Sequence, residues 1–349
     1  MKNIILRAAA AALTAIFLFS YQPLLCAALQ TKEEMPEIIG IKEWKSADGP
    51  LKKKRVLGAT VLIHFSSFTD LRSLYKGDTL INWQSKYYAY GLRVIHMLTP
   101  NFEFEKEITI PQHFSKKTQI NYPIALDYKK IQWEAYRNPD KPFDFLIDTR
   151  GRIRYRISSF ESFENEEKMI QTLIKETDPS FEMELEKYPL SKIPKVQDFP
   201  LGYRKDFRLG NSEKPRSEIR QHFKLPEREL NSDLIYLSGY WKLYDEYAET
   251  AQGGAEIRFN WDGSPLFILG GIDQEAPTPI EVKIDGNPQI SDKLKGSDLV
   301  KQGDGYYIFL QKIKIYSIIR RLPEGQHSLI LRFPEAGAKI YKLAVPRKK

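Results

Sequence analysis

Cysteine is almost absent from this chain. Cys26 is its one cysteine in 349 residues, and a single cysteine cannot form a disulfide within the chain, so a fold held by disulfides is excluded. Histidine is also scarce. The five histidines lie far apart, and no pair has the local spacing of a metal site, so we expect no metal centre and no cofactor. The sequence also has no internal repeat and no low-complexity tract.

The composition is that of a folded protein with more than one domain. Hydrophobic residues make up 42% of the chain and charged residues 28%, which is typical of globular proteins. A chain of this length favours two domains. The formal net charge is +8, but the basic residues are scattered among acidic ones and no recognition motif accompanies them. We therefore expect no nucleic-acid partner.

The first 28 residues are typical of a secretory signal. Lys2 and Arg7 precede a short apolar run from Ala8 to Phe19, and small residues then allow cleavage after Ala28. The apolar run is too short to favour a membrane span, although an uncleaved anchor is the alternative. We therefore expect an exported protein of the bacterial periplasm or cell surface.

Cys26 gives a second interpretation of the same segment. It would be the lipidated residue if the chain were a bacterial lipoprotein. Leu25 stands directly before it, where such signals need a small residue, so we rank lipidation second to cleavage. Contact with a membrane is expected only through this leader.

Residues 37–178 alternate between apolar strand patterns and helical patterns. The order favours an α/β sheet with helices on both faces. Thr149, Arg150 and Gly151 form a turn signal of hairpin length between the last two strands. The expected strands are 61–65, 92–98, 122–127, 143–148 and 152–157, and the expected helices are 71–90, 129–136 and 161–176.

The rest of the chain changes character twice. Residues 179–230 are polar and rich in proline, which indicates an extended linker. Residues 231–349 contain many short strand patterns separated by turn pairs such as Asp262-Gly263 and Asp285-Gly286, which favour a β-sandwich. The expected strands are 240–244, 255–261, 265–269, 281–284, 306–310 and 328–333, with one short helix at 314–320.

Motifs spread over nearly all of the mature chain resemble one known family. The first domain is similar to the thioredoxin-like (redoxin, TlpA-type) domain of the DipZ family. The second resembles the β-sandwich that follows it there, of jelly-roll or carbohydrate-binding-module type. The matching motifs are GIKEW from Gly40, VLIHF from Val61, TPNFEFEK from Thr99, YPIALD from Tyr122, PFDFLID from Pro142, GRIRYR from Gly151, LGY from Leu201, LSGYW from Leu237 and VKIDG from Val282.

The chain differs from this family at the positions that carry the family's thiol chemistry. The resemblance implies a C-x-x-C motif at the start of the first helix, but Asp70 and Ser73 stand at the cysteine positions. Ser66 and Thr69 stand where the family carries tryptophans. Thiol–disulfide exchange requires a thiolate as nucleophile, which neither aspartate nor serine supplies. We therefore expect no catalytic residue of the thiol type here.

Two further positions are implied by the resemblance. His64 corresponds to the buried acid that can relay protons near the thiols. Pro142 corresponds to the proline, cis in thioredoxins, beside which an extended chain can bind. Phe68, Asp70, Ser73 and Pro142 would then line a groove for a partner, unless Pro142 serves the fold alone.

The same loop admits a catalytic and a structural interpretation. A serine-type site would need His64 beside Ser73 as a base, but His64 lies in an apolar strand and is better explained as a buried, hydrogen-bonded side chain. Asp70 is better explained as the cap of the helix that begins near Leu71.

The aromatic residues of the second domain also have two interpretations. They could form a platform that stacks against sugars, or they could pack between the sheets, which is the commoner role. The residues concerned are Tyr240, Trp241, Tyr244, Tyr247 and Trp261.

The sequence thus predicts an exported, non-catalytic binding or accessory protein of the cell envelope, with a protein or peptide partner. One alternative is a component of a thiol-redox pathway that docks on a thiol partner without exchanging electrons. Another is a glycan-binding protein that acts through the β-sandwich.

Overall fold

The computed structural model describes residues 33–45, 50–107, 120–138, 143–158, 161–188, 194–203, 207–286 and 290–347. The expected signal, with Cys26, lies outside these residues. The chain forms two compact units. The first comprises residues up to 65 together with 80–99 and 110–191, and the second comprises 66–79, 100–109 and 192–349. Each is described by itself below.

The first sheet has the thioredoxin-like order that the sequence motifs predict. Its six strands lie in the order β1-β4-β3-β2-β5-β6. β3 and β4 are parallel, whereas β5 is antiparallel to β2 and β6. The strands are β1 (Glu43–Lys45), β2 (Thr60–Ser66), β3 (Leu92–Leu98), β4 (Ile124–Leu126), β5 (Phe143–Ile147) and β6 (Ile153–Ser158). The helices are α2 (Lys53–Val56), α3 (Leu71–Tyr87), α5 (Ile131–Ala135) and α6 (Phe163–Lys175), with 3-10 turns η1 (Tyr88–Tyr90) and η2 (Glu103–Lys106).

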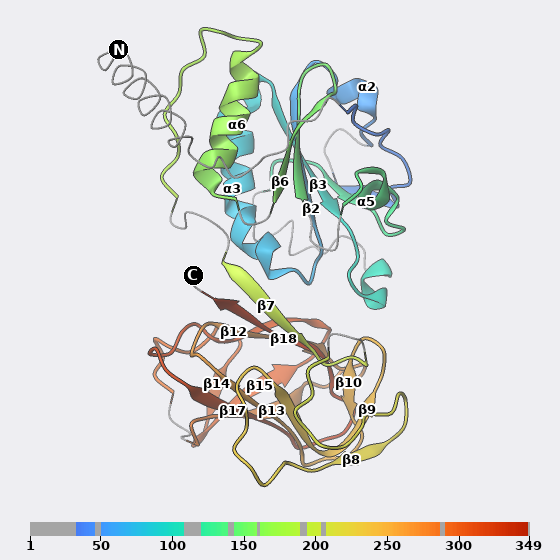
Figure 1. Cartoon of the computed structure of the whole chain (residues 1–349), viewed down its shortest axis with the longest axis vertical. Coiled ribbons are helices and arrows are strands. Elements are labelled where there is room, and N and C mark those ends of the chain that lie inside the picture. The colour runs from blue at the N-terminus through green and yellow to red at the C-terminus, as the bar shows by residue number, and fades with distance from the viewer. Residues whose placement is uncertain are drawn as a thin grey trace, which may run out of the picture. The chain divides into compact units, whose positions relative to one another are not determined.

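Strand β2 is buried on both faces because helices cover the sheet on both sides. α3 and α6 lie along one face and α5 along the other (Figure 1). Val61, Ile63 and Phe65 pack in one core cluster, with Trp133 of α5 against it. Side chains alternate along a strand, so Leu62 and His64 point to the other face.

A buried carboxylate joins α3 to α6 and to the segment that follows α6. Glu167 is buried and accepts hydrogen bonds from the hydroxyls of Tyr87 and Tyr188, from the ammonium of Lys86, and from the backbone N–H of Glu186. Burial alone would raise the pKa of Glu167, but these donors outweigh it and lower the pKa. The network therefore holds a charged group inside the fold.

The second unit is rich in β-structure and forms the expected β-sandwich. Its strands follow the path β14-β15-β13-β17-β11-β9-β10-β18-β12-β16, with β7 beside β18 and β8 beside β9. They are β7 (Lys195–Pro200), β8 (Gln221–Phe223), β9 (Ile235–Leu243), β10 (Ala248–Thr250), β11 (Ala255–Trp261), β12 (Leu266–Gly271), β13 (Thr278–Ile284), β14 (Val300–Gln302), β15 (Gly305–Leu310), β16 (Lys314–Ile319), β17 (His327–Phe333) and β18 (Lys339–Arg347). β7 and β8 come from the segment in which the sequence predicts an extended linker.

Strand β9 passes from one layer of the sandwich to the other at Gly239. Residues 235–238 pair with β11, whereas residues 241–243 pair with β10. Gly239 lies between them with φ +82°, and a Cβ there would approach the Cα of Ala255 to 2.9 Å. Glycine is favoured at such a bend because it has no side chain.

The structure contradicts one prediction of secondary structure made from the sequence. Residues 314–320 were expected to form a short helix, but Lys314–Ile319 form strand β16, paired antiparallel with β12. Ile315, Ile318 and Ile319 fit a helical spacing, but pairing with β12 and burial of Tyr316 and Ile318 in the core favour the strand.

None of the helices in the described parts of the chain is long and apolar enough to cross a membrane.

Candidate binding site

The loop at the expected active-site position is closed by an aspartate. The Oδ1 atom of Asp70 accepts a hydrogen bond from the backbone N–H of Arg72 at 3.0 Å, which confirms the predicted cap of α3. The Arg72 side chain reaches back, and its Nε lies 2.8 Å and 2.9 Å from the two carboxylate oxygens. Asp70 is only 5% exposed. Its carboxylate is therefore bonded within the protein, at a position where the sequence resemblance implies a thiol.

A second buried carboxylate, Glu105 of η2, holds the same loop from the other side. It accepts hydrogen bonds from the backbone N–H groups of Thr69 at 3.0 Å, Phe102 at 3.1 Å and Asn101. Burial raises the pKa of Glu105, although these bonds oppose the rise. Glu105 is the second glutamate of the TPNFEFEK motif, so the motif organises the loop.

The hydroxyl groups of the loop also bond to one another. The Ser67 Oγ atom accepts from the backbone N–H of Thr69 at 3.2 Å and from the Asn101 amide at 2.8 Å, and it lies 3.1 Å from the Thr69 hydroxyl. Ser66 and Thr69 are both buried. The loop therefore has a packed, polar interior.

The expected groove residues are only partly covered by the structure. Asp70 is buried and Phe68 is half-buried. Ser73 lies in the first turn of α3, but its side chain lies outside the described residues, as does Pro142. The groove as a whole stays a prediction.

His64 belongs to a buried cluster on the sheet. Its Nδ1 atom lies 2.8 Å from the Asp144 carboxylate, and its ring centroid lies 4.8 Å from that of His96. Burial, with a smaller contribution from the neighbouring His64, holds the pKa of His96 well below its usual range, while Asp144 opposes this shift. His64 is 4% exposed, so it is a buried, hydrogen-bonded side chain as the structural interpretation expects.

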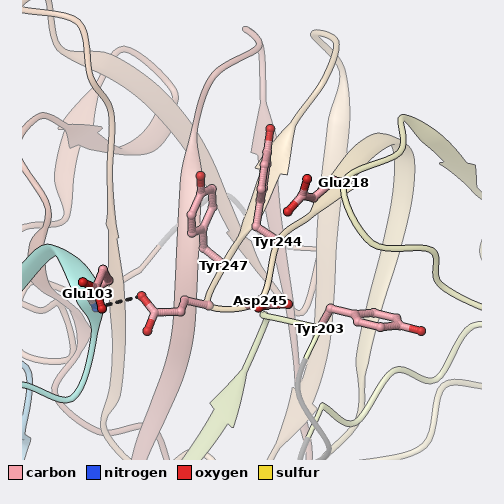
Figure 2. A pocket seen from close by; sticks show the side chains of 7 residues that line it. Glu103, Tyr203, Glu218, Tyr244, Asp245 and Tyr247 are labelled. Atoms are coloured by element: carbon pink, nitrogen blue, oxygen red, sulfur yellow. Dashed lines mark hydrogen bonds between the residues drawn. The ribbon is translucent and has the colours of Figure 1, made fainter.

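A hollow in the second unit combines tyrosines with carboxylates. It is an open hollow with a volume of about 720 Å³. The rings of Tyr244 and Tyr247 stack with centroids 4.7 Å apart, and Figure 2 shows them side by side with Glu218 next to Tyr244. Its other lining residues are Glu103, Tyr203, Asp245 and Glu246.

Backbone contacts hold the walls of this tyrosine–carboxylate pocket in place. The N–H of Tyr203 donates to the carbonyl of Tyr244 at 2.7 Å, and the N–H of Glu218 donates to that of Leu243 at 2.7 Å. Gly202 packs so closely on the β9–β10 turn that a Cβ would lie 2.2 Å from the Asp245 carbonyl. Main-chain bonds thus position residues that are distant in sequence.

The sequence located this pocket only in part. Tyr244 and Tyr247 belong to the expected aromatic platform, and both line the pocket. Trp241 and Trp261 are instead buried in the core, as the packing interpretation expects. Tyr203 belongs to the LGY motif but was not expected in a site, and no sequence signal identified Glu218. Main-chain hydrogen bonds to Tyr244 and Leu243 bring the two residues to the pocket.

The fold defines a thioredoxin-like domain together with a β-sandwich, and the loop before α3 contains no cysteine. Residues 197–344 match the family described as Thioredoxin like C-terminal domain. Over 257 residues the chain is 25% identical to proteins named Protein DipZ from Mycobacterium bovis and Mycobacterium tuberculosis. These matches confirm the thioredoxin-like, DipZ-type resemblance that the motifs indicate.

The match covers 70% of this chain and 36% of each relative, so the chain spans about a third of their length.

Solved structures are also similar to it. A thiol:disulfide interchange protein of the thioredoxin family from Chlorobium tepidum is 14% identical with a TM-score of 0.34, and the match covers 42% of this chain and 99% of that one. The thioredoxin domain of a thiol-disulfide oxidoreductase from Bacteroides vulgatus is 19% identical with a TM-score of 0.31, over 37% and 88% of the two chains.

Proposed function

We propose that this chain is a non-catalytic binding or accessory protein of the bacterial cell envelope, built on a thioredoxin-like scaffold. The observation that carries the proposal is the pair of Asp70 and Arg72. A helix start that would stabilise a thiolate in a thiol enzyme here holds a carboxylate already engaged by the chain itself.

Among the side chains that the structure describes near the loop, we identify no group that would substitute for a thiol. Aspartate cannot take part in thiol exchange, and a general base must reach the proton that it removes. His64 is buried in its strand and its Nδ1 atom faces Asp144. We therefore assign the loop a structural role.

We therefore expect a partner to bind at a site that has exposed polar and aromatic groups. The tyrosine–carboxylate pocket has such groups on a framework fixed by main-chain hydrogen bonds. Preorganised sites lose less entropy when a partner binds. A protein or peptide of the envelope is the partner that we propose, and the leader at residues 1–28 would direct export.

Partner capture by the folded and the unfolded chain tests this function. The chain without residues 1–28 is immobilised and exposed to an envelope fraction, and a heat-unfolded sample of the same chain serves as the control. We expect envelope proteins that stay on the folded chain through the wash and are absent from the unfolded one. Equal retention on the two samples would contradict the proposal.

A further inference from the structure

The tyrosine–carboxylate pocket carries a one-sided charge. Four of its seven lining residues are acidic, three are tyrosines, and none is basic. A positive charge placed near a carboxylate is attracted to it. The pocket is therefore electrostatically matched to a positively charged group.

Two of the four carboxylates remain available for a ligand. Glu103 forms an ion pair with Lys106 at 2.7 Å, and a carboxylate oxygen of Glu246 accepts from the N–H of Glu103 at 2.9 Å. Glu218 and Asp245 are exposed, and neither forms an ion pair with the parts of the chain that the structure describes. These two side chains can turn toward a bound cation.

The tyrosine stack supplies the second kind of contact. Tyr247 is stacked on Tyr244, and the ammonium of Lys339 lies 5.3 Å from its ring centroid. The ammonium of Lys339 thus already makes a cation–π contact with the Tyr247 ring of this stack. Glu218 lines the same pocket as Tyr244, and its N–H bonds the carbonyl of the preceding residue, Leu243, at 2.7 Å. A cation in the pocket would therefore have both an aromatic ring and a carboxylate available to it.

We propose that this pocket binds the guanidinium or ammonium group of an arginine or lysine side chain on a protein partner, an inference that rests on the proposed function. A planar guanidinium stacks on an aromatic ring and bonds a carboxylate at the same time. A neutral sugar would also stack on Tyr244, but it would leave Glu218 and Asp245 without an opposite charge. The charge therefore favours a basic peptide over a glycan.

Calorimetric titration of the full mature chain tests the proposal with defined probes. The probes are N-acetyl-arginine amide, the neutral isostere N-acetyl-citrulline amide, and a neutral oligosaccharide. We expect the arginine probe to bind, the citrulline probe to bind at least about tenfold more weakly, and about 0.5 M salt to weaken binding of the arginine probe. Binding of citrulline or sugar at equal strength would overturn the proposal.

Amide variants of the pocket carboxylates remove their charge and keep polar atoms, so they separate charge attraction to the probe from hydrogen bonding to it. Glu218→Gln with Asp245→Asn keeps polar atoms of the same size, and we expect it to weaken arginine binding about tenfold. Tyr244→Leu removes the ring face and should weaken binding about threefold. The matched control is Glu275→Gln with Asp304→Asn, which removes the same charge from exposed sites outside the pocket, and it should leave binding unchanged.

The outcomes also separate this inference from the proposed function. If the pocket variant loses neither the arginine probe nor the captured partner, the ligand class is wrong while the binding function stands. If the folded chain captures no more envelope protein than the unfolded chain, the function fails whatever the probe does. An arginine probe that does not bind to the unmodified chain contradicts the inference directly.

Discussion

Asp70 and Arg72 form a closed pair at the start of α3, in which the aspartate accepts the arginine's backbone N–H at 3.0 Å and its Nε at 2.8 Å. The aspartate thus satisfies a helix N–H that has no partner within the helix and neutralises the neighbouring side chain. This is the position at which a thioredoxin-like enzyme would need a reactive thiolate.

Replacing Asp70 should lower stability. Asp70→Ala removes the cap and leaves the buried loop without its carboxylate, so we expect a loss of about 1–2 kcal/mol in the free energy of unfolding. Asp70→Asn keeps an acceptor oxygen and should lose less. Urea denaturation measures both, and an unchanged midpoint for Asp70→Ala would show that the cap contributes nothing.

Glu105 should matter more as an acceptor than as a charge. Glu105→Ala leaves the backbone N–H groups of Thr69, Asn101 and Phe102 without their acceptor, at a cost of about 3 kcal/mol. Glu105→Gln retains an acceptor oxygen and loses the buried charge, so its loss should be smaller. Chemical denaturation of the two variants provides the comparison. Equal losses would mean that the charge itself holds the loop.

His96 should make stability depend on pH below neutrality. Burial holds the pKa of His96 well below 6.5 in the folded chain, so the unfolded chain binds the proton first. Its contribution to stability is complete above pH 6.5 and falls as the pH drops, by about 1.4 kcal/mol per pH unit. The difference between the wild-type chain and His96→Asn, measured by denaturation at several pH values, isolates this slope. Parallel curves would exclude it.

Gly202 should be essential for the shape of the pocket. In Gly202→Ala the new Cβ would lie 2.2 Å from the Asp245 carbonyl, so the turn must move, at a cost of about 2 kcal/mol. Binding of the arginine probe should weaken with it. Gly77→Ala is the matched control because a Cβ there meets no atom within 4 Å. Intact binding by Gly202→Ala would mean that the turn does not shape the site.

Local patterns in the sequence predicted the elements that depend on local chemistry. The apolar run from Val61 to Phe65 gave β2, and Asp70 before Leu71 gave the start of α3, because burial and capping act over a few residues. The resemblance to the family predicted the thioredoxin-like order of the first sheet, and the structure confirms it.

Features that depend on distant contacts could not be predicted. Strand β16 was expected as a helix because its isoleucines fit both periods, and only pairing with β12 decides between them. The carboxylate of Glu105 joins Thr69 across 36 residues, and Glu218 reaches the β9–β10 turn through a main-chain bond. A single sequence does not show which strands will pair, so neither contact could be anticipated.

The reduction of insulin disulfides by dithiothreitol in the presence of the mature chain tests the central claim most directly. The account predicts the rate of dithiothreitol alone for the unmodified chain, which has no cysteine after residue 26. It predicts a faster rate for the chain with Asp70→Cys and Ser73→Cys, because the resemblance places the two thiols of a thiol enzyme at these positions, where the start of α3 would stabilise a thiolate. A double-cysteine chain that is no faster than the unmodified one would contradict the account.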